Sequence, residues 1–389
     1  MSLRKPISKL LQVAVATTLV AGCGGGGESA STQVPVSLAP GDQTQTLEPT
    51  WSLAGASPVE VGVATEDITA ILDHVFGDDA VQSAMLVKNG YVIGERYIDG
   101  ADAASLGTSW SVAKSFYSAA VGVAIDEGWI ESLDTPASVH FAEWRGTDKA
   151  DITIRHLLEM RGGLPAQSSI FVEFNQTEYA LSLAKVREEG TTFAYSNPTS
   201  QLFSPLIERS TGQSAHDYLR EKILVPIGID PDTIGMWLDP TGVNPITYWG
   251  LDMNPEAFAR FGLLYARAGE WNGTQVISPE YIAASLSAQS AFYGFQWWIL
   301  NDTFFGQSVP INVQAALGLD GQKIYVWPDG DVVLVVLTRY AHDRNQGYVL
   351  SLTNFPDTCT GRNNCPTSVG DEVPGYDEHT LVELLAQLD

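Results

Sequence analysis

The chain has 389 residues, of which 46 are acidic and 21 are basic, so its formal net charge is −25. Such a charge repels the phosphate backbone and excludes nucleic acid as a partner. Hydrophobic residues make up 44% of the sequence, and the length suits one large soluble domain or two.

Residues 1–22 predict a secretory signal peptide. A positive end with Arg4 and Lys5 precedes an apolar core over residues 10–19, which is too short to span a bilayer comfortably. The tetrapeptide that ends at Cys23 is similar to a bacterial lipobox, which implies cleavage before this cysteine and its lipidation. An ordinary signal peptide with an unlipidated cysteine is the alternative.

Gly24, rather than an aspartate, follows Cys23, and in the lipoprotein pattern this implies sorting to the outer membrane. We therefore expect a bacterial outer-membrane lipoprotein that faces the periplasm or the cell surface and is held by acyl chains on Cys23. Residues 23–58 are rich in Gly, Ser, Thr, Pro and Gln, and we interpret them as a flexible tether. The folded domain is then expected over residues 59–389.

The patterns that follow predict an α/β (α+β) fold with antiparallel strands. An amphipathic helix is expected over 65–76, followed by a hairpin with a strong Asn89-Gly90 turn. Helical and loop segments are expected from 111 to about 310, and two strands then flank a Pro-Asp-Gly turn. The other expected elements are strands over 84–88, 91–97, 323–327 and 332–338, and a final helix over 378–388.

Ser111 and Lys114 form a Ser-x-x-Lys motif. The run from Phe116 to Ile125 is apolar nearly all round, which predicts a buried helix with Ser111 and Lys114 in its first turn. Residues three apart share a helix face, and a lysine that loses its charge on burial can act as the base for a serine nucleophile. Alternatively, Ser111 only caps the helix and Lys114 is a surface residue.

The same motif occurs twice more. Ser2/Lys5 belongs to the targeting segment. Ser182/Lys185 lies in a polar, helix-forming stretch, and we interpret it as a solvated helix face.

Tyr195 and Asn197 form the second candidate group, at the start of a predicted helix. A phenol can pass a proton between a serine and a leaving group when a neighbouring ammonium lowers its pKa. The asparagine amide can hold the lysine or a substrate carbonyl. The simpler interpretation, which can hold as well, is that Asn197 caps a helix with Pro198 in its first turn.

A third group, the glycine-rich stretch 318–322, opens the strand over 323–327. Glycines there let a substrate approach the backbone closely, although a plain loop entering a hairpin is the alternative. Six of the ten tryptophans lie between residues 237 and 327. We interpret them mainly as core residues and secondarily as the lining of an apolar pocket.

In this order, the three groups resemble the serine β-lactamase-like superfamily. It includes class C β-lactamases, penicillin-binding D-Ala-D-Ala carboxypeptidases, esterases and 6-aminohexanoate-dimer hydrolases, of which the last are most similar. Ser111 precedes Tyr195 by 84 residues, as is typical of the class C-like branch, whereas Ser182 precedes it by only 13. The resemblance covers roughly residues 65–345 and includes the stretches 152–164, 210–219, 254–273 and 293–298. It implies an antiparallel sheet built from both chain ends, a largely helical inserted region, and a site in the cleft between them.

The resemblance also implies an acyl-enzyme mechanism. Ser111 would be the nucleophile, with Lys114 and Tyr195 as general base and acid. Asn197 would bind substrate, and the backbone at Gly321 and Gln322 would complete an oxyanion hole with that of Ser111.

No cofactor and no metal are expected, because the six histidines are scattered without ligand-like spacing. Cys359 and Cys365 lie close together in a Gly/Asn/Pro-rich loop. In an oxidising periplasm we expect them to form a small disulfide.

One position departs from the resemblance. Leu319 and Asp320 stand where lactamases and carboxypeptidases have Lys-Thr-Gly or a His variant, whose cation grips a substrate carboxylate. A leucine cannot do so, and an aspartate would repel the carboxylate. We therefore expect a hydrolase for neutral or cationic small-molecule esters or amides. The alternatives are a D-Ala-D-Ala carboxypeptidase or β-lactamase, and a non-catalytic penicillin-binding-like envelope protein.

Overall fold

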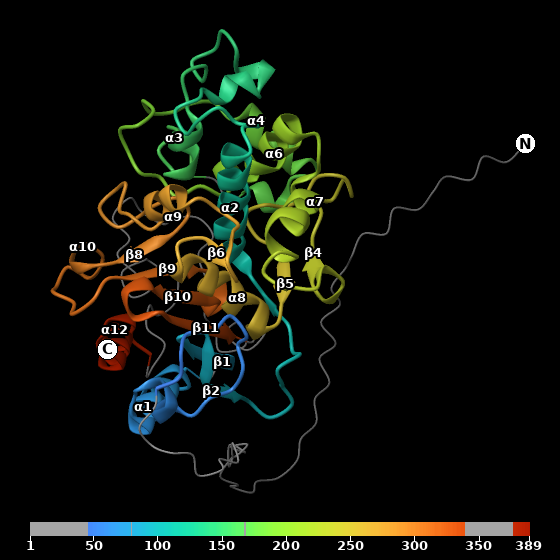
Figure 1. Cartoon of the computed structure of the whole chain (residues 1–389). Helices are drawn as coiled ribbons and strands as arrows, with labels where there is room; N and C mark the ends of the chain where they lie inside the picture. Colours follow the sequence, from blue (N-terminus) through green and yellow to red (C-terminus); the bar gives the residue numbers. More distant parts are fainter. Residues whose placement is uncertain (1–45, 79, 167–168, 339–375) are drawn as a thin grey trace, which may run out of the picture. The chain divides into compact units, whose positions relative to one another are not determined.

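A six-stranded antiparallel sheet is the centre of the fold (Figure 1), in the computed structural model that describes residues 46–78, 80–166, 169–338 and 376–389. The strand order β2-β1-β11-β10-β9-β8 brings the two ends of the domain together, because β1 pairs with β11. This confirms the expected α+β class with an antiparallel sheet. The strands are β1 (Val81–Lys88), β2 (Tyr91–Tyr97), β8 (Trp298–Leu300), β9 (Val313–Leu317), β10 (Lys323–Trp327) and β11 (Val332–Thr338).

The predicted hairpin is confirmed. Asn89 and Gly90 both have left-handed backbones, with φ of 53° and 75°, as a two-residue turn between twisted strands requires. Glycine is also needed for space, because a Cβ at Gly90 would lie 1.6 Å from the carbonyl oxygen of Thr50. Part of the segment that the sequence suggested as a tether thus runs beside this hairpin, and Ala56 N donates to Val92 O at 3.0 Å.

Strand β11 is apolar along its length because both faces of the sheet are covered. Val333 and Val335 contact the cluster built around α2 (Ala113–Asp126) and α8 (Pro255–Ala266). Leu334 and Val336 point to the opposite cluster, which includes α1 (Thr65–Val75) and α12 (Glu378–Leu385). Alternate residues of a strand face opposite sides, so this run serves two cores.

The predicted helices over 65–76 and 378–388 and the strands over 323–327 and 332–338 are confirmed to within a few residues. The expectation of only helices and loops from 111 to 310 is wrong, because this region contributes β8 and all but one of the strands of two small sheets. Those sheets contain β3 (Gly107–Thr108), β4 (Gly235–Met236), β5 (Leu251–Met253), β6 (Glu270–Trp271) and β7 (Thr274–Gln275). The other helices are α3 (Ile154–Leu158), α4 (Gln176–Ser182), α5 (Asn197–Gln201), α6 (Phe203–Thr211), α7 (Ala215–Leu219), α9 (Pro279–Ser285) and α10 (Asp302–Phe305).

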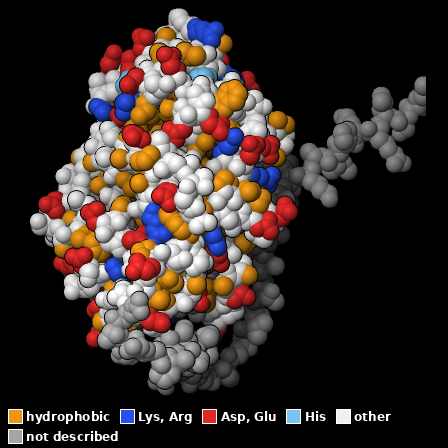
Figure 2. Space-filling view, viewed as in Figure 1, with side chains coloured by type: hydrophobic (Ala, Val, Ile, Leu, Met, Phe, Trp, Pro, Cys, Tyr) orange, Lys and Arg blue, Asp and Glu red, His pale blue; other side chains and the backbone are white. Residues whose placement is uncertain are grey.

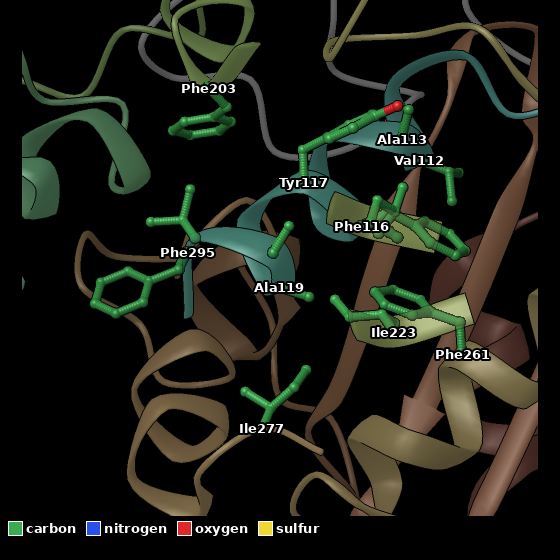
Figure 3. Close-up of a cluster of buried hydrophobic side chains, with 14 of the residues drawn as sticks. Val112, Ala113, Phe116, Tyr117, Ala119, Phe203, Ile223, Phe261, Ile277 and Phe295 are labelled. Carbon is green, nitrogen blue, oxygen red and sulfur yellow. The ribbon is translucent and has the colours of Figure 1, made fainter. Parts of the chain in front are cut away.

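Helix α2 is the buried helix that its apolar sequence predicts. Its side chains lie among groups from α6, α8 and the segments around Ile223 and Ile277 (Figure 3). The Phe116 ring stacks on Phe261 with centroids 3.6 Å apart. A side chain at Gly122 would meet the Tyr281 ring at 2.5 Å, so the helix packs closely along its length.

The surface mixes charge with apolar groups. On the face drawn in Figure 2, acidic, basic and hydrophobic side chains are interspersed, and basic groups do not gather into one patch. Within the described ranges, no helix combines the length and apolar character needed to cross a bilayer.

Candidate active site

Ser111 lies in a 3₁₀ turn, η2 (Trp110–Val112), directly before α2 begins at Ala113. The expectation that it sits in the first turn of α2 is therefore wrong by two residues, a usual error for a helix boundary. Ser109 fixes the turn to β5, because its N donates to Leu251 O at 2.7 Å and its Oγ accepts from Leu251 N at 3.0 Å. These hydrogen bonds to β5 thus hold Ser111 at the N-terminal end of the buried helix α2.

Trp110 takes a strained backbone immediately before the candidate nucleophile. Its φ is 45°, in the left-handed region that a bulky residue rarely adopts, at a cost of about 1–3 kcal/mol. Stacking of its ring on Trp249, with centroids 5.2 Å apart, helps to hold it there. Strain of this kind is typical of residues that position a reactive group.

Lys114 is buried beside the serine, with a relative exposure of 1%. Its Nζ lies 2.7 Å from Ser111 Oγ and donates to the Tyr248 carbonyl oxygen at 2.9 Å. Burial lowers the pKa of Lys114 well below its ordinary value. A neutral amine in this position can accept the serine proton, and the alternative of a surface lysine is wrong.

Tyr195 also lies beside Lys114, whose Nζ is 5.0 Å from the centre of the phenol ring. Burial raises the pKa of the Tyr195 phenol, and a hydrogen bond with the Ser111 side chain offsets only part of that shift. The expectation that a neighbouring ammonium lowers this pKa is therefore wrong, because burial has the largest effect and raises it. A phenol that stays protonated can serve as a proton donor.

Asn197 follows at the first position of α5, and the cap of this helix is Ser196, whose Oγ accepts from Thr199 N at 3.2 Å. The alternative in which Asn197 is the cap is therefore wrong. Within the described residues, Asn197 Oδ1 is buried and has no hydrogen-bond partner. A buried acceptor left unpaired costs about 1–3 kcal/mol, which is tolerated where the group meets a ligand.

The glycine-rich stretch lies against the nucleophile turn. A Cβ at Gly318 would be 2.5 Å from the Ser109 carbonyl oxygen, so only glycine allows this approach. Gly321 has a φ of 94° and ends a 3₁₀ turn that leads into β10. The buried Gln322 side chain is bound to β11, where its Nε2 donates to Thr338 Oγ1 at 2.7 Å. Its backbone therefore remains the part of this residue that suits the predicted oxyanion role.

Gln296 joins the helices behind the site and was not singled out in the sequence. Its side chain is 2% exposed, and its Nε2 donates to the carbonyl oxygens of Leu157 and Leu158 at the end of α3. Ser200 of α5 donates to its Oε1 at 2.8 Å, and Ser115 of α2 donates to its backbone oxygen at 2.7 Å. In the sequence, the feature that could have indicated this role is a single amide side chain within the aromatic stretch 293–298.

The second Ser-x-x-Lys pair is not brought to the site. Helix α4 ends at Ser182, whose side chain is exposed, and Lys185 pairs with Glu189 at 2.5 Å. No group of three or more potential metal ligands occurs in the described part of the chain. Cys23, Cys359 and Cys365 lie outside the described residues.

A sequence profile describes the class of protein that these features define. The Beta-lactamase family profile matches residues 79–349, and the chain belongs to this family, whose members are generally serine hydrolases. Comparison with the sequences of curated proteins finds no match.

Solved structures share the fold at low sequence identity. A candidate 6-aminohexanoate-dimer hydrolase from Bacillus anthracis is 19% identical with a TM-score of 0.57, over 76% of this chain and 81% of its own. A penicillin-binding protein homologue from Caulobacter crescentus is 16% identical with a TM-score of 0.58, over 71% and 92%. A beta-lactamase from Mycobacterium bovis is 22% identical with a TM-score of 0.52, over 69% and 90%. Identities this low establish a shared fold alone.

Proposed function

We propose that the protein cleaves an ester or amide bond through an acyl-enzyme on Ser111. The observation that supports this most directly is the 2.7 Å between Lys114 Nζ and Ser111 Oγ, with the amine buried and its pKa lowered. Serine is a weak nucleophile until a base accepts its proton, and a neutral amine at hydrogen-bond distance meets that need.

In the proposed first step, Lys114 takes the hydroxyl proton while Ser111 Oγ forms a bond to the substrate carbonyl carbon. The backbone N–H groups of Ser111 and Gln322 donate to the oxygen that becomes negative. Tyr195 then gives its phenolic proton to the departing alcohol or amine, and the Lys114 ammonium returns a proton to Tyr195. Water hydrolyses the acyl-enzyme, releasing the acid and the free serine.

The substrate is expected to be neutral or cationic. Leu319 occupies the turn that leads into β10, where the resemblance would place a cation for a substrate carboxylate. Gly318, the residue before it, approaches Ser109, so this turn lies next to the nucleophile. An apolar side chain there gives a carboxylate no partner.

The place of action is proposed from the N-terminal pattern. Lipidation of Cys23 would attach the protein to the outer membrane, with substrates met in the periplasm or at the cell surface. Replacement by Cys23→Ser should move the protein from the membrane fraction to the soluble fraction of the cell envelope. Unchanged membrane attachment would contradict the anchor without affecting the proposed chemistry.

Hydrolysis of p-nitrophenyl butyrate tests the proposed reaction. The purified protein is compared with Ser111→Ala and with Ser182→Ala, which removes the exposed serine of the second motif. Turnover should be lost in the first variant alone, and a serine-reactive phosphonate should lose its leaving group and add the mass of its phosphonyl group to Ser111. Inertness to both reagents would favour the non-catalytic alternative, whereas covalent labelling of Ser111 by penicillin would favour the lactamase or carboxypeptidase alternative.

A further inference from the structure

Exposed hydrophobic side chains gather at one edge of the candidate site. Of the eleven large hydrophobic residues that are exposed among the described residues, five lie in two short segments, 172–174 and 237–243. Isolated exposed apolar residues are ordinary, whereas a cluster beside a reactive group indicates a binding surface. These five are Val172, Phe174, Trp237, Leu238 and Val243. Trp237 is 46% exposed and Phe174 is 70% exposed.

The two segments lie together and are ordered by hydrogen bonds. Asn244 Nδ2 donates to Asn175 Oδ1 at 3.1 Å, and Gln176 N donates to Asp239 Oδ2 at 3.0 Å. Asp239 is buried although it is a carboxylate, which its several donors explain. The apolar side chains are thus presented by a fixed frame.

Stacked rings connect this surface to the nucleophile turn. Trp237 lies 5.1 Å from Trp249, and Trp249 stacks on Trp110 at 5.2 Å between ring centroids. Phe171 packs edge-on to Trp110 at 6.3 Å. We call these four residues the aromatic rim. Because Trp110 precedes Ser111 in the chain, the rim leads from the surface to the reactive serine.

The rim reaches Lys114 through an aromatic contact that does not include the proton donor. Phe171 of the rim packs against Tyr248, whose ring centre is 5.7 Å from Lys114 Nζ. Tyr195 belongs to a different aromatic group and stacks on Trp298 at 5.5 Å. A leaving group that takes its proton from Tyr195 lies beside that second group, which leaves the rim available to the acyl part of the substrate.

We propose that the aromatic rim binds the acyl group of the substrate, and that this group is an uncharged alkyl or aryl chain. The inference rests on the proposed hydrolase function. Trp237 Nε1 donates to the Asp252 carboxylate at 2.7 Å, which orients the ring and places a negative charge beside it. A carboxylate on the acyl chain would be repelled there, whereas each methylene buried against the rings strengthens binding about four-fold.

A series of p-nitrophenyl acetate, butyrate and octanoate tests the proposal, because the leaving group stays constant while the acyl chain grows. In Trp237→Ala, kcat/KM for octanoate should fall about ten-fold and that for acetate less than about two-fold. Trp129→Ala is the matched control, since Trp129 is 50% exposed and its Nε1 also donates to a carboxylate, that of Glu127 at 2.9 Å. Its kinetics should not change.

Phe174→Ala provides a second variant that removes an exposed side chain of the same surface. It should weaken octanoate turnover in the same direction by a smaller factor. Equal losses for acetate and octanoate, or the same loss in Trp129→Ala, would overturn the acyl-binding role. A dimer in light scattering that Trp237→Ala dissociates, with chain-length preference unchanged, would assign the surface to self-association and overturn it too. Absence of Ser111-dependent turnover with every ester would instead refute the proposed function.

Discussion

Replacement of Lys114 by methionine should change both the activity and the pH dependence of stability. Methionine keeps the length of the side chain but has no titratable amine. Because Lys114 has a lowered pKa in the folded protein and an ordinary one when unfolded, the unfolded chain binds more protons between those two values. Folded stability therefore rises with pH in this window, by about 1.4 kcal/mol per pH unit for one proton.

Below the pKa of the folded state, both states carry the charge and the dependence disappears, although the cost of burying it remains. The measurement is urea unfolding of the wild type and Lys114→Met at several pH values from 6.5 to 8.5. As the pH rises, the free energy of unfolding of the wild type should increase relative to that of Lys114→Met by up to about 1.4 kcal/mol per pH unit. Other buried lysines, such as Lys88 and Lys149, are present in both proteins and cancel in the difference.

Activity should depend on the protonation of the Lys114 amine as well. Loss of the amine should lower kcat/KM by about 10²–10⁴-fold, as expected for a general base. The wild-type kcat/KM should rise with pH as Lys114 loses its proton and then level off. A stability difference that stays constant across this pH range, together with a pH-independent kcat/KM, would refute the assignment of a neutral lysine.

Three further substitutions separate chemistry from scaffolding. Tyr195→Phe should lower kcat by about 10²–10⁴-fold with little change in the urea midpoint, and unchanged kcat would remove the phenol from the mechanism. Gly318→Ala should reduce activity together with stability, because its Cβ would lie 2.5 Å from Ser109 O; normal values for both would contradict the close approach. Glu378→Ala should cost about 3–5 kcal/mol in urea unfolding, since it breaks the buried 3.0 Å pair with Lys323, while kcat is retained.

Local sequence patterns predicted the elements that local physics determines. The Asn-Gly pair at 89–90 predicts a tight turn because both residues tolerate the left-handed backbone that they adopt. The apolar run of α2 predicts a helix that is buried on all sides, as the structure shows. Strands β8 and β9 were not predicted. Trp298–Leu300 is only three residues long and Val313–Leu317 pairs with segments on either side of it, so their strand character comes from neighbours in the sheet.

The candidate site divides in the same way. Ser111 and Lys114 were predictable because their spacing is local, whereas the carbonyl of Tyr248 that receives the lysine N–H comes from 134 residues further along the chain. Gln296 likewise acts through contacts with three helices that only the folded topology brings together. The roles of Ser111, Lys114, Tyr195, Asn197 and the glycine-rich stretch stay predictions until the variants are measured.

Burial gives the two titratable groups of the site complementary properties. Removal from water disfavours the charged form of each, so it lowers the pKa of Lys114 and raises that of Tyr195. The same low-polarity environment therefore favours an amine with a free lone pair beside a phenol that keeps its proton. A base and an acid of this kind, each hydrogen-bonded to Ser111, can exchange one proton around the serine without a lasting charge on either. The apolar packing around the site thus contributes to the proposed chemistry as well as to the fold.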